Sequence, residues 1–236
     1  MLKFVIVIPT YNEKANLEKL LPQIFALPLE NLSVLIVDDN SPDGTGQFAE
    51  QLSAGEPRVK VLHRPQKAGL GRAYIAGFKQ ALAGGADYIL EMDADLSHDP
   101  KYLPAILAAA ANCDLVLGSR YVRGGGVSNW NLTRRLISRF GNIYARLILS
   151  LPYHDLTGGF KCYRRAVLEN IGLDDLSSVG YNFQIETTYQ AHLKGYRICE
   201  VPIVFTERAE GQSKFDFKIM LESFWKVLRL RIRRGK

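Results

Sequence analysis

Two aspartates that follow an apolar run are the residues best suited to chemistry. Asp93 and Asp95 come one and three residues after the predicted strand at 88–92. Side chains alternate along an extended chain, so both carboxylates are expected on one side. Such a pair suits Mg²⁺ or Mn²⁺, which prefer oxygen ligands and also bind substrate phosphates. We predict a metal and diphosphate site here, and expect Asp99 to cap the helix that begins near Pro100.

A second acidic segment, VDDNSPDGT at 37–45, follows another apolar run. A carboxylate in this place can accept hydrogen bonds from a ribose hydroxyl or a nucleobase edge. We assign that role to Asp39, and expect Asp38 or Asp43 to form an Asx turn before the helix after Gly44. The glycines match neither a P-loop nor a dinucleotide fingerprint, which argues against a nucleotide hydrolase or a dehydrogenase.

Five short apolar runs predict the strands that would position these acids. They occupy residues 4–8, 32–37, 59–62, 88–92 and 115–118. Helical patterns separate them, so the sequence predicts an α/β fold with a mainly parallel central sheet and helices on both faces. In such sheets, ligands bind beyond the carboxyl ends of the strands. The segments PTYNE, VDDNSPDGT, DADLSHDP and SRYVRGGG all lie at such ends.

The second half of the chain predicts loops and amphipathic helices. The segment GGGVSNWN at 124–131 lacks periodicity and is long enough for a lid, and 205–214 also predicts a loop. Residues 134–150 predict an amphipathic helix. The segment 160–204 predicts mixed helix and strand.

The final helix is predicted at 217–234, with Phe224 and Trp225 on an apolar side and basic residues opposite. That arrangement is typical of a helix at a membrane interface, although its apolar side could equally pack on the domain. We expect a catalytic domain at 1–214 and a basic amphipathic C-terminal helix at 215–236.

Charge is distributed unevenly along the chain. The net charge is +6, yet residues 1–114 carry 14 acidic and 10 basic residues. Residues 115–154 contain six arginines and no acid, and residues 214–236 contain eight basic and two acidic residues. This predicts a front half able to hold a cation and two later zones able to hold anions.

Length and cysteine content set further bounds. A chain of 236 residues that is 47% hydrophobic can bury the core of a single domain. Cys113, Cys162 and Cys199 are odd in number and widely spaced, so no disulfide framework or zinc site is expected and a reducing cytosolic setting is the default. No run of 18 apolar residues occurs, so we expect a soluble or peripheral protein without a signal peptide.

Six segments together resemble one enzyme family. They are PTYNE (9–13), VDDNSPDGT (37–45), AGLGRAYIAGF (68–78), MDADLSHDP (92–100), GSRY (118–121) and DLTGGFKCYRR (155–165). The combination is similar to the dolichol-phosphate mannosyltransferases, also called polyprenol monophosphomannose synthases, of glycosyltransferase family 2, which have the GT-A fold. The resemblance extends through nearly the whole chain. It implies inverting transfer of mannose from GDP-mannose to a polyprenyl phosphate.

The resemblance also implies roles for single residues. The nucleotide-sugar site would comprise Pro9, Tyr11, Glu13, Val37, Asp39, Asp93, Ala94, Asp95, Arg120, Arg208 and Lys214. Asp93 and Asp95 would bind Mg²⁺ or Mn²⁺, and Asp95, Arg120 and Arg208 are the expected catalytic residues. Some relatives carry Gln in place of Ser97, which leaves open whether Ser97 or a water supplies a third metal ligand.

Residues 115–154, which contain no acidic residue, are the expected site of the acceptor phosphate. The resemblance implies contacts from Arg120, Arg134 and Ser138, and an arginine suits phosphate because its guanidinium donates hydrogen bonds in pairs. The neighbouring arginines of the same helix are expected to form a solvated face. These are Arg135, Arg139 and Arg146. A phosphate has a second pKa of about 6, so we expect no general base.

The expected partners are GDP-mannose, a polyprenyl phosphate lipid and a membrane surface, with no nucleic acid. We expect a cytoplasmic protein, peripheral on the cytoplasmic face of a membrane. Docking through the final helix and dependence on a separate transmembrane subunit both stay open. Two rivals are glucose transfer from UDP-glucose to a lipid phosphate and sugar transfer to a hydroxyl acceptor. A nucleic-acid binder is disfavoured by the acids at the strand ends.

Overall fold

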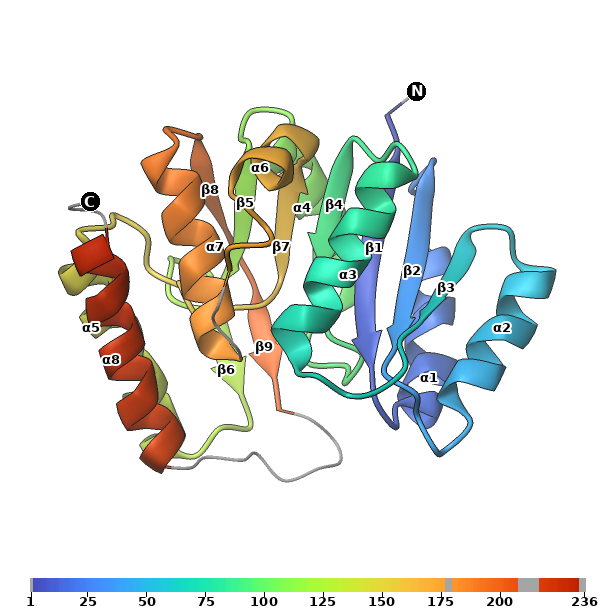
Figure 1. The fold of residues 1–236 in the computed structure, drawn as a ribbon, viewed down its shortest axis with the longest axis horizontal. Helices are drawn as coiled ribbons and strands as arrows, with labels where there is room; N and C mark the ends of the chain where they lie inside the picture. The colour runs from blue at the N-terminus through green and yellow to red at the C-terminus, as the bar shows by residue number, and fades with distance from the viewer. Residues whose placement is uncertain (1, 177–179, 208–216, 234–236) are drawn as a thin grey trace.

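A seven-stranded sheet forms the centre of the molecule in the computed structural model, which describes residues 2–176, 180–207 and 217–233 (Figure 1). The strands are β1 (Phe4–Thr10), β2 (Leu32–Asp38), β3 (Val59–His63), β4 (Tyr88–Glu91), β5 (Leu115–Ser119), β7 (Lys161–Arg164) and β8 (Ile198–Pro202). Their order is β3-β2-β1-β4-β7-β5-β8, and only β7 runs antiparallel to its neighbours. The five predicted strands and the mainly parallel sheet are confirmed.

Helices cover both faces of this sheet, as the apolar runs predict. The helices of the molecule are α1 (Lys14–Phe25), α2 (Thr45–Gly55), α3 (Leu70–Ala83), α4 (Leu103–Ala110), α5 (Leu132–Leu149), α6 (Arg165–Asn170), α7 (Tyr181–Leu193) and α8 (Phe217–Arg233), with a 3₁₀ turn η1 (Pro100–Tyr102), and of these α5 and α8 lie at one end of the sheet. Alternation along β1 sends Ile6 and Ile8 into the core under α1 and α4, and Val7 into the core under α3. Figure 1 shows α3, α6 and α7 together on one side of the sheet.

A third apolar cluster joins α5, α7 and α8 at one end of the molecule. Its buried members include Ala145 of α5, Tyr189 of α7, and Val227 and Leu230 of α8. Figure 1 shows α5 and α8 side by side, at a distance from the edge strand β3. In the part of the chain that the structure describes, no helix is both long enough and apolar enough to cross a membrane.

Phe224 and Trp225 of α8 do not share one face, so that detail of the sequence prediction is wrong. Phe224 packs against Tyr144 of α5, with ring centroids 4.3 Å apart. Trp225, the next residue, is 72% exposed. Consecutive residues of a helix point about 100° apart, so one of the two turns away when the other packs.

Two predicted loops contain short strands. β6 (Gly126–Ser128) and β9 (Val204–Thr206) pair in parallel as a separate two-stranded sheet. The prediction of irregular loops is therefore wrong at 126–128 and at 205–206, while 208–214 lies outside the described residues. Three-residue strands pair through backbone atoms of distant segments, and they are too short to create a periodic side-chain pattern.

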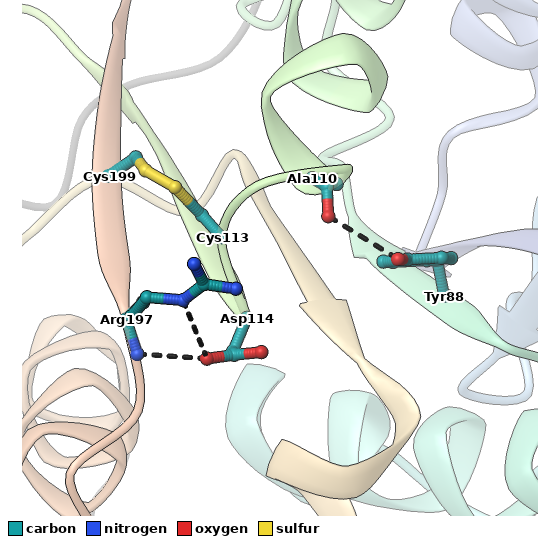
Figure 2. Close-up of a disulfide and its surroundings, with 6 residues drawn as sticks. All are labelled: Tyr88, Ala110, Cys113, Asp114, Arg197 and Cys199. Atoms are coloured by element: carbon teal, nitrogen blue, oxygen red, sulfur yellow. Dashed lines mark hydrogen bonds and ion pairs between the residues drawn. A yellow bond between two sulfur atoms is a disulfide. The ribbon is translucent and has the colours of Figure 1, made fainter.

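The structure pairs two of the three cysteines, contrary to the prediction. Figure 2 shows a disulfide between Cys113, just before β5, and Cys199 in β8, and their Cα atoms are 6.1 Å apart. Parallel pairing of β5 with β8 brings together residues separated by 86 positions. Cys162 is free and buried. Sequence spacing could not predict this pairing because it depends on strand order.

Candidate active site

A cavity of about 240 Å³, here called the polar cavity, lies at the carboxyl ends of β1, β2 and β4. Its walls are Pro9, Thr10, Tyr11, Glu13, Asp39, Lys67, Gly69, Leu70, Ala73, Asp93, Ala94 and Asp95. Seven of the predicted nucleotide-sugar residues are thus brought together. Val37 is not among the residues that line this cavity. Its side chain is buried in the core against Gly77 of α3, where an added Cβ would lie 2.9 Å from it.

Asp39 is anchored on the wall of the polar cavity by a basic partner. Nη1 of Arg64 lies 2.5 Å from Oδ1 of Asp39, and both side chains are largely buried. Burial raises the pKa of Asp39, although the charge of Arg64 opposes that effect. The carboxylate is therefore oriented before any ligand arrives, as recognition of a ribose or a base requires.

The neighbouring acids have the structural roles that the sequence predicts. Oδ2 of Asp38 accepts a hydrogen bond from the Ser41 amide at 3.1 Å, and Oδ1 of Asp43 accepts one from the Thr45 amide at 3.0 Å. Asp99 accepts a hydrogen bond from the Lys101 amide and so caps η1. The turn and cap interpretations are confirmed.

The carboxylates of Asp93 and Asp95 are held by hydrogen bonds from different elements. Oδ1 of Asp93 accepts a hydrogen bond from the hydroxyl of Tyr74 in α3 at 2.8 Å. Oδ1 of Asp95 accepts from the amide of Ser97 at 3.1 Å and from its hydroxyl at 2.5 Å. The Ser97 hydroxyl thus orients Asp95 through its proton, and the choice between Ser97 and a water as third metal ligand stays open.

This pair of carboxylates fits a hard divalent cation. Asp93 and Asp95 both line the polar cavity and offer oxygen donors. Among the described residues, no group of three or more His, Cys, Asp and Glu side chains is arranged to hold a metal. An ion bound by the two aspartates would have places in its shell for water and substrate oxygens, the mode that Mg²⁺ favours.

His98 contacts the backbone of the segment that carries Asp93 and Asp95. Its Nδ1 accepts a hydrogen bond from the Asp93 amide at 3.0 Å, and its ring stacks on Phe160 with centroids 5.0 Å apart. Burial lowers the pKa of His98, so the neutral ring is favoured. His98 therefore orients the segment that carries Asp93.

A buried polar layer lies beneath the aspartates, where β4 pairs with β7. Glu91 and Lys161 are register partners and are fully buried. The Tyr163 hydroxyl donates to Oε1 of Glu91 at 2.9 Å, and Nζ of Lys161 donates to the carbonyl of Gln184 at 2.6 Å. Burial raises the pKa of Glu91 to about 7 and lowers that of Lys161 to about 8, while their mutual attraction opposes both shifts.

A second cavity, here called the apolar cavity, has a volume of about 160 Å³ and runs between α5, α7 and α8. Its walls are Asp93, His98, Arg120, Trp130, Arg134, Ile137, Ser138, Gly141, Tyr144, Thr157, Gly158, Gly159, Asn182, Ile185, Phe205, Phe224 and Val227. All three predicted acceptor-phosphate residues are among them. Asp93 lines both cavities, so the two meet at the first aspartate of the predicted metal site.

Arg120 lies in the wall of the apolar cavity within a buried ion pair. Its Nε and Nη2 donate to the two carboxylate oxygens of Asp155, both at 2.7 Å, and Nη2 also donates to Thr157 at 2.8 Å. Burial would raise the pKa of Asp155, but the charge and hydrogen bonds of Arg120 outweigh it and the pKa is lowered. The guanidinium is therefore fixed in orientation.

Arg134 and Ser138 point into the apolar cavity from one side of α5. The Arg134 guanidinium lies over the ring of Trp130, 4.3 Å from its centroid, and pairs with Glu207. The Ser138 hydroxyl accepts a hydrogen bond from Tyr121 at 2.7 Å. The other arginines of the helix are exposed, as predicted. These are Arg135, Arg139 and Arg146.

Several residues at the two cavities escaped prediction from the sequence. Asp155 pairs with Arg120 across 35 positions, and Tyr74 reaches Asp93 across 19. Trp130 stood in the segment 124–131, which was predicted to be a loop long enough for a lid, with no role for this residue. The one available signal was the presence of Tyr74 and Asp155 in segments that carry the family resemblance. Arg208 and Lys214 lie outside the described residues, so their predicted roles stay predictions.

Comparison with known proteins supplies an independent view. The profile described as "Glycosyl transferase family 2" matches residues 5–172. A polyprenol monophosphomannose synthase from Mycolicibacterium smegmatis is 46% identical over 232 residues, covering 97% of this chain and 87% of the relative. An undecaprenyl-phosphate mannosyltransferase from Micrococcus luteus is also 46% identical, over 228 residues, covering 97% and 93%.

Solved structures share the fold at low identity. A mannosyltransferase from Pyrobaculum calidifontis in complex with GDP-Man and Mn²⁺ has a TM-score of 0.63 at 19% identity, covering 99% of this chain and 64% of that one. A glucosyl-3-phosphoglycerate synthase from Mycobacterium tuberculosis, in complex with Mn²⁺, UDP and glucosyl-3-phosphoglycerate, has a TM-score of 0.69 at 17% identity, covering 98% and 79%. At these identities the likeness establishes the fold alone.

Proposed function

The chain belongs to glycosyltransferase family 2, and from that premise we propose that it transfers mannose from GDP-mannose to a polyprenyl phosphate with inversion at the anomeric carbon. Both relatives at 46% identity are named for mannose transfer to a lipid phosphate. The relative named for glucose transfer is only 17% identical. Glucose transfer from UDP-glucose is therefore not favoured.

The observation that carries the proposal is the meeting of the two cavities at Asp93. The polar cavity offers acidic and aromatic side chains suited to a nucleotide, and the apolar cavity offers arginines suited to a phosphate. A sugar attached to a diphosphate in the first cavity would present its anomeric carbon toward a phosphate in the second. Proximity of this kind converts two bound substrates into one reacting pair.

The acceptor phosphate needs positioning rather than activation. It is an anion at neutral pH because its second pKa is about 6. Arg120, Arg134 and Ser138 would orient its oxygens for attack on the anomeric carbon as GDP leaves from the opposite side. His98 is not assigned as a base, because its Nδ1 already accepts a hydrogen bond from the backbone. Arg208 and Lys214 are proposed to contact the diphosphate.

Asp93 and Asp95 are proposed to hold Mg²⁺ or Mn²⁺. When bound, such an ion neutralises charge that develops on the leaving diphosphate. Solved members of the fold class contain Mn²⁺ or Mg²⁺. The division into a catalytic domain at 1–214 and a C-terminal helix at 215–236 is part of the same proposal.

A membrane surface is the proposed location of the reaction, on the cytoplasmic face. α5 presents an apolar stripe to solvent, and α8 adds two further apolar side chains. Their members are Leu132 (71% exposed), Leu136 (59%), Phe140 (59%), Ile143 (46%) and Leu147 (71%), with Trp225 (72%) and Ile232 (73%) on α8. The exposed arginines of α5 flank the stripe, which suits an anionic bilayer. A separate transmembrane subunit would be an additional partner.

The test of the reaction is transfer of radiolabel from GDP-mannose to an organic-soluble polyprenyl phosphate with Mn²⁺ or Mg²⁺. We expect metal-dependent transfer that EDTA and Asp95→Ala both abolish. Asp99→Ala is the matched control, because Asp99 caps a turn outside both cavities and should leave transfer largely intact. Transfer from UDP-glucose but not from GDP-mannose would contradict the donor assignment.

Membrane docking is tested by sedimentation with vesicles of anionic or neutral lipid. Leu136→Asp and Leu147→Asp should each reduce binding to anionic vesicles, because each places a charge within the apolar stripe. Gln51→Asp is the control, since Gln51 is exposed on α2 and lies away from the stripe. Equal binding by all three variants would exclude α5 as the docking surface.

A further inference from the structure

The apolar cavity changes character along α5. Arg134, Ser138, Gly141 and Tyr144 follow one another at spacings of four, three and three residues, and all line it. A helix rises 1.5 Å per residue, so the lining from Arg134 to Tyr144 extends about 15 Å. The end of the cavity at Arg134 is polar, because the Arg134 guanidinium lies there over the ring of Trp130.

The opposite end is apolar and its polar atoms are engaged. Tyr144 packs on Phe224, and the Tyr144 hydroxyl donates to the Phe224 carbonyl at 3.1 Å. Ile185 of α7 and Val227 of α8, both buried, complete this end. A ligand here would meet apolar carbon rather than hydrogen-bonding groups.

Gly141 lies between the two ends, in the interior of an 18-residue helix. Glycine is the least favourable helix residue apart from proline, so its presence needs a reason. Close packing is not that reason, because a Cβ at Gly141 would meet no heavy atom within 4 Å apart from its chain neighbours and the backbone of its own helix. At Gly77, by contrast, a Cβ would lie 2.3 Å from Val7. The missing side chain at Gly141 leaves open the middle of the apolar cavity.

We propose that the apolar end of this cavity binds the first isoprene units of the acceptor, and that Gly141 is the position that admits them. This inference rests on the proposed function. A phosphate held by Arg134 and Ser138 would carry its hydrocarbon chain away from the cations, past Gly141 and toward Tyr144 and Phe224. Burial of that chain is favourable in proportion to its apolar area.

The size of the cavity limits how much chain it holds. Pockets that enclose a whole drug-sized ligand have volumes of about 300–1,000 Å³. The apolar cavity has about 160 Å³, so only the first units fit and the rest of a long chain must leave it. The exposed apolar stripe on the outer side of α5 is the adjoining hydrocarbon-compatible surface.

The experiment uses acceptors with one, two and three isoprene units on a phosphate, assayed in detergent micelles so that membrane docking does not contribute. For the unaltered chain, kcat/KM should rise with each added unit that enters the cavity. Gly141→Leu should raise the acceptor KM at least tenfold and remove the gain from added units. It should leave the KM for GDP-mannose within twofold and the thermal midpoint equal or higher, since leucine favours the helix.

Three comparisons make the result decisive. Gly141→Ala adds one small carbon and should change the acceptor KM less than threefold. Thr133→Leu adds the same side chain to an exposed position of α5 and should leave both KM values unchanged. Should Gly141→Leu fail to fold, Gly141→Met carries the same comparison. A folded variant with an unaltered acceptor KM and an unaltered dependence on chain length would overturn the inference. Absence of transfer by the unaltered chain would instead refute the proposed function.

Discussion

The hydroxyl of Tyr74 donates a 2.8 Å hydrogen bond to Oδ1 of Asp93 from a fully buried side chain. Its ring packs against Phe78 and Phe183, with centroids 5.8 and 6.1 Å away, and those two rings also stack on each other. Burial and the charge of Asp93 raise the pKa of Tyr74 well above its ordinary value, so the phenol stays protonated and donates. The carboxylate at the junction of the two cavities is thereby fixed from the core side.

Tyr74→Phe should weaken metal binding without unfolding the protein. Loss of a partner that orients a metal ligand costs about 10–100-fold in metal affinity or activity. We expect the Mn²⁺ concentration for half-maximal transfer to rise by that factor, as measured by titrating the metal at saturating substrates. Tyr88→Phe is the matched control, because its hydroxyl bonds to the Ala110 carbonyl far from the cavities. An unchanged metal titration for Tyr74→Phe would show that the bond is structural only.

Trp130→Ala should weaken acceptor binding. The Trp130 ring lies under Arg134 at 4.3 Å and faces Arg120 at 5.5 Å, and cation–π contacts contribute about 0.5–2 kcal/mol. We expect the acceptor KM to rise about 3–30-fold, with the KM for GDP-mannose unchanged. Trp130→Phe, which keeps an aromatic face, should recover part of the loss. Equal acceptor KM values for Trp130→Ala and the unaltered chain would refute this role.

Lys161→Met should destabilise the fold more at pH 8 than at pH 5.5. Glu91 has a pKa of about 7 in the folded state against an ordinary value of 4.5, so its contribution to stability declines as pH rises from 4.5 through 7. Lys161 has a pKa of about 8 against 10.5, so its contribution is complete above 10.5 and declines as pH falls through 8. At pH 8 the variant removes the cation that lowers the pKa of Glu91, so the buried carboxyl either stays charged without that cation or takes up a proton, and both cost stability.

We expect that loss to be about 1–3 kcal/mol at pH 8, the cost of a buried group without its partner. At pH 5.5 Glu91 binds a proton and the loss should be smaller. Urea unfolding of the single variant and of Glu91→Gln with Lys161→Met measures both values. In the double variant, the loss of unfolding free energy should be the same at pH 8 as at pH 5.5. The same loss at both pH values in Lys161→Met would contradict the assignment of Glu91 as the titrating group.

The pairing of Cys113 with Cys199 predicts one reactive thiol in the denatured, unreduced protein. Thiol titration in denaturant should count one group before reduction and three after it. Cys162→Ser should abolish the signal before reduction. Three thiols before reduction would restore the expectation of a reduced cytosolic chain, because disulfides are rare in that compartment.

Local patterns in the sequence determined much of this protein. The apolar runs gave the five strands, because a strand buried on both faces must be apolar along its length. The position of Asp93 and Asp95 just after β4 followed from the same runs. The separation of Arg134 and Ser138 from the exposed arginines of α5 followed from helical spacing. Each of these features depends on residues close together in the chain.

Only the tertiary structure decided which distant side chains support the site. The antiparallel insertion of β7 between β4 and β5 sets Lys161 opposite Glu91, and no local pattern encodes that strand order. The same order brings Cys113 to Cys199, and the fold brings Asp155 to Arg120. The emptiness beside Gly141 likewise appears only when α5, α7 and α8 pack together. Contacts across the sheet and between helices depend on how the chain crosses itself, and that information is spread over the whole sequence.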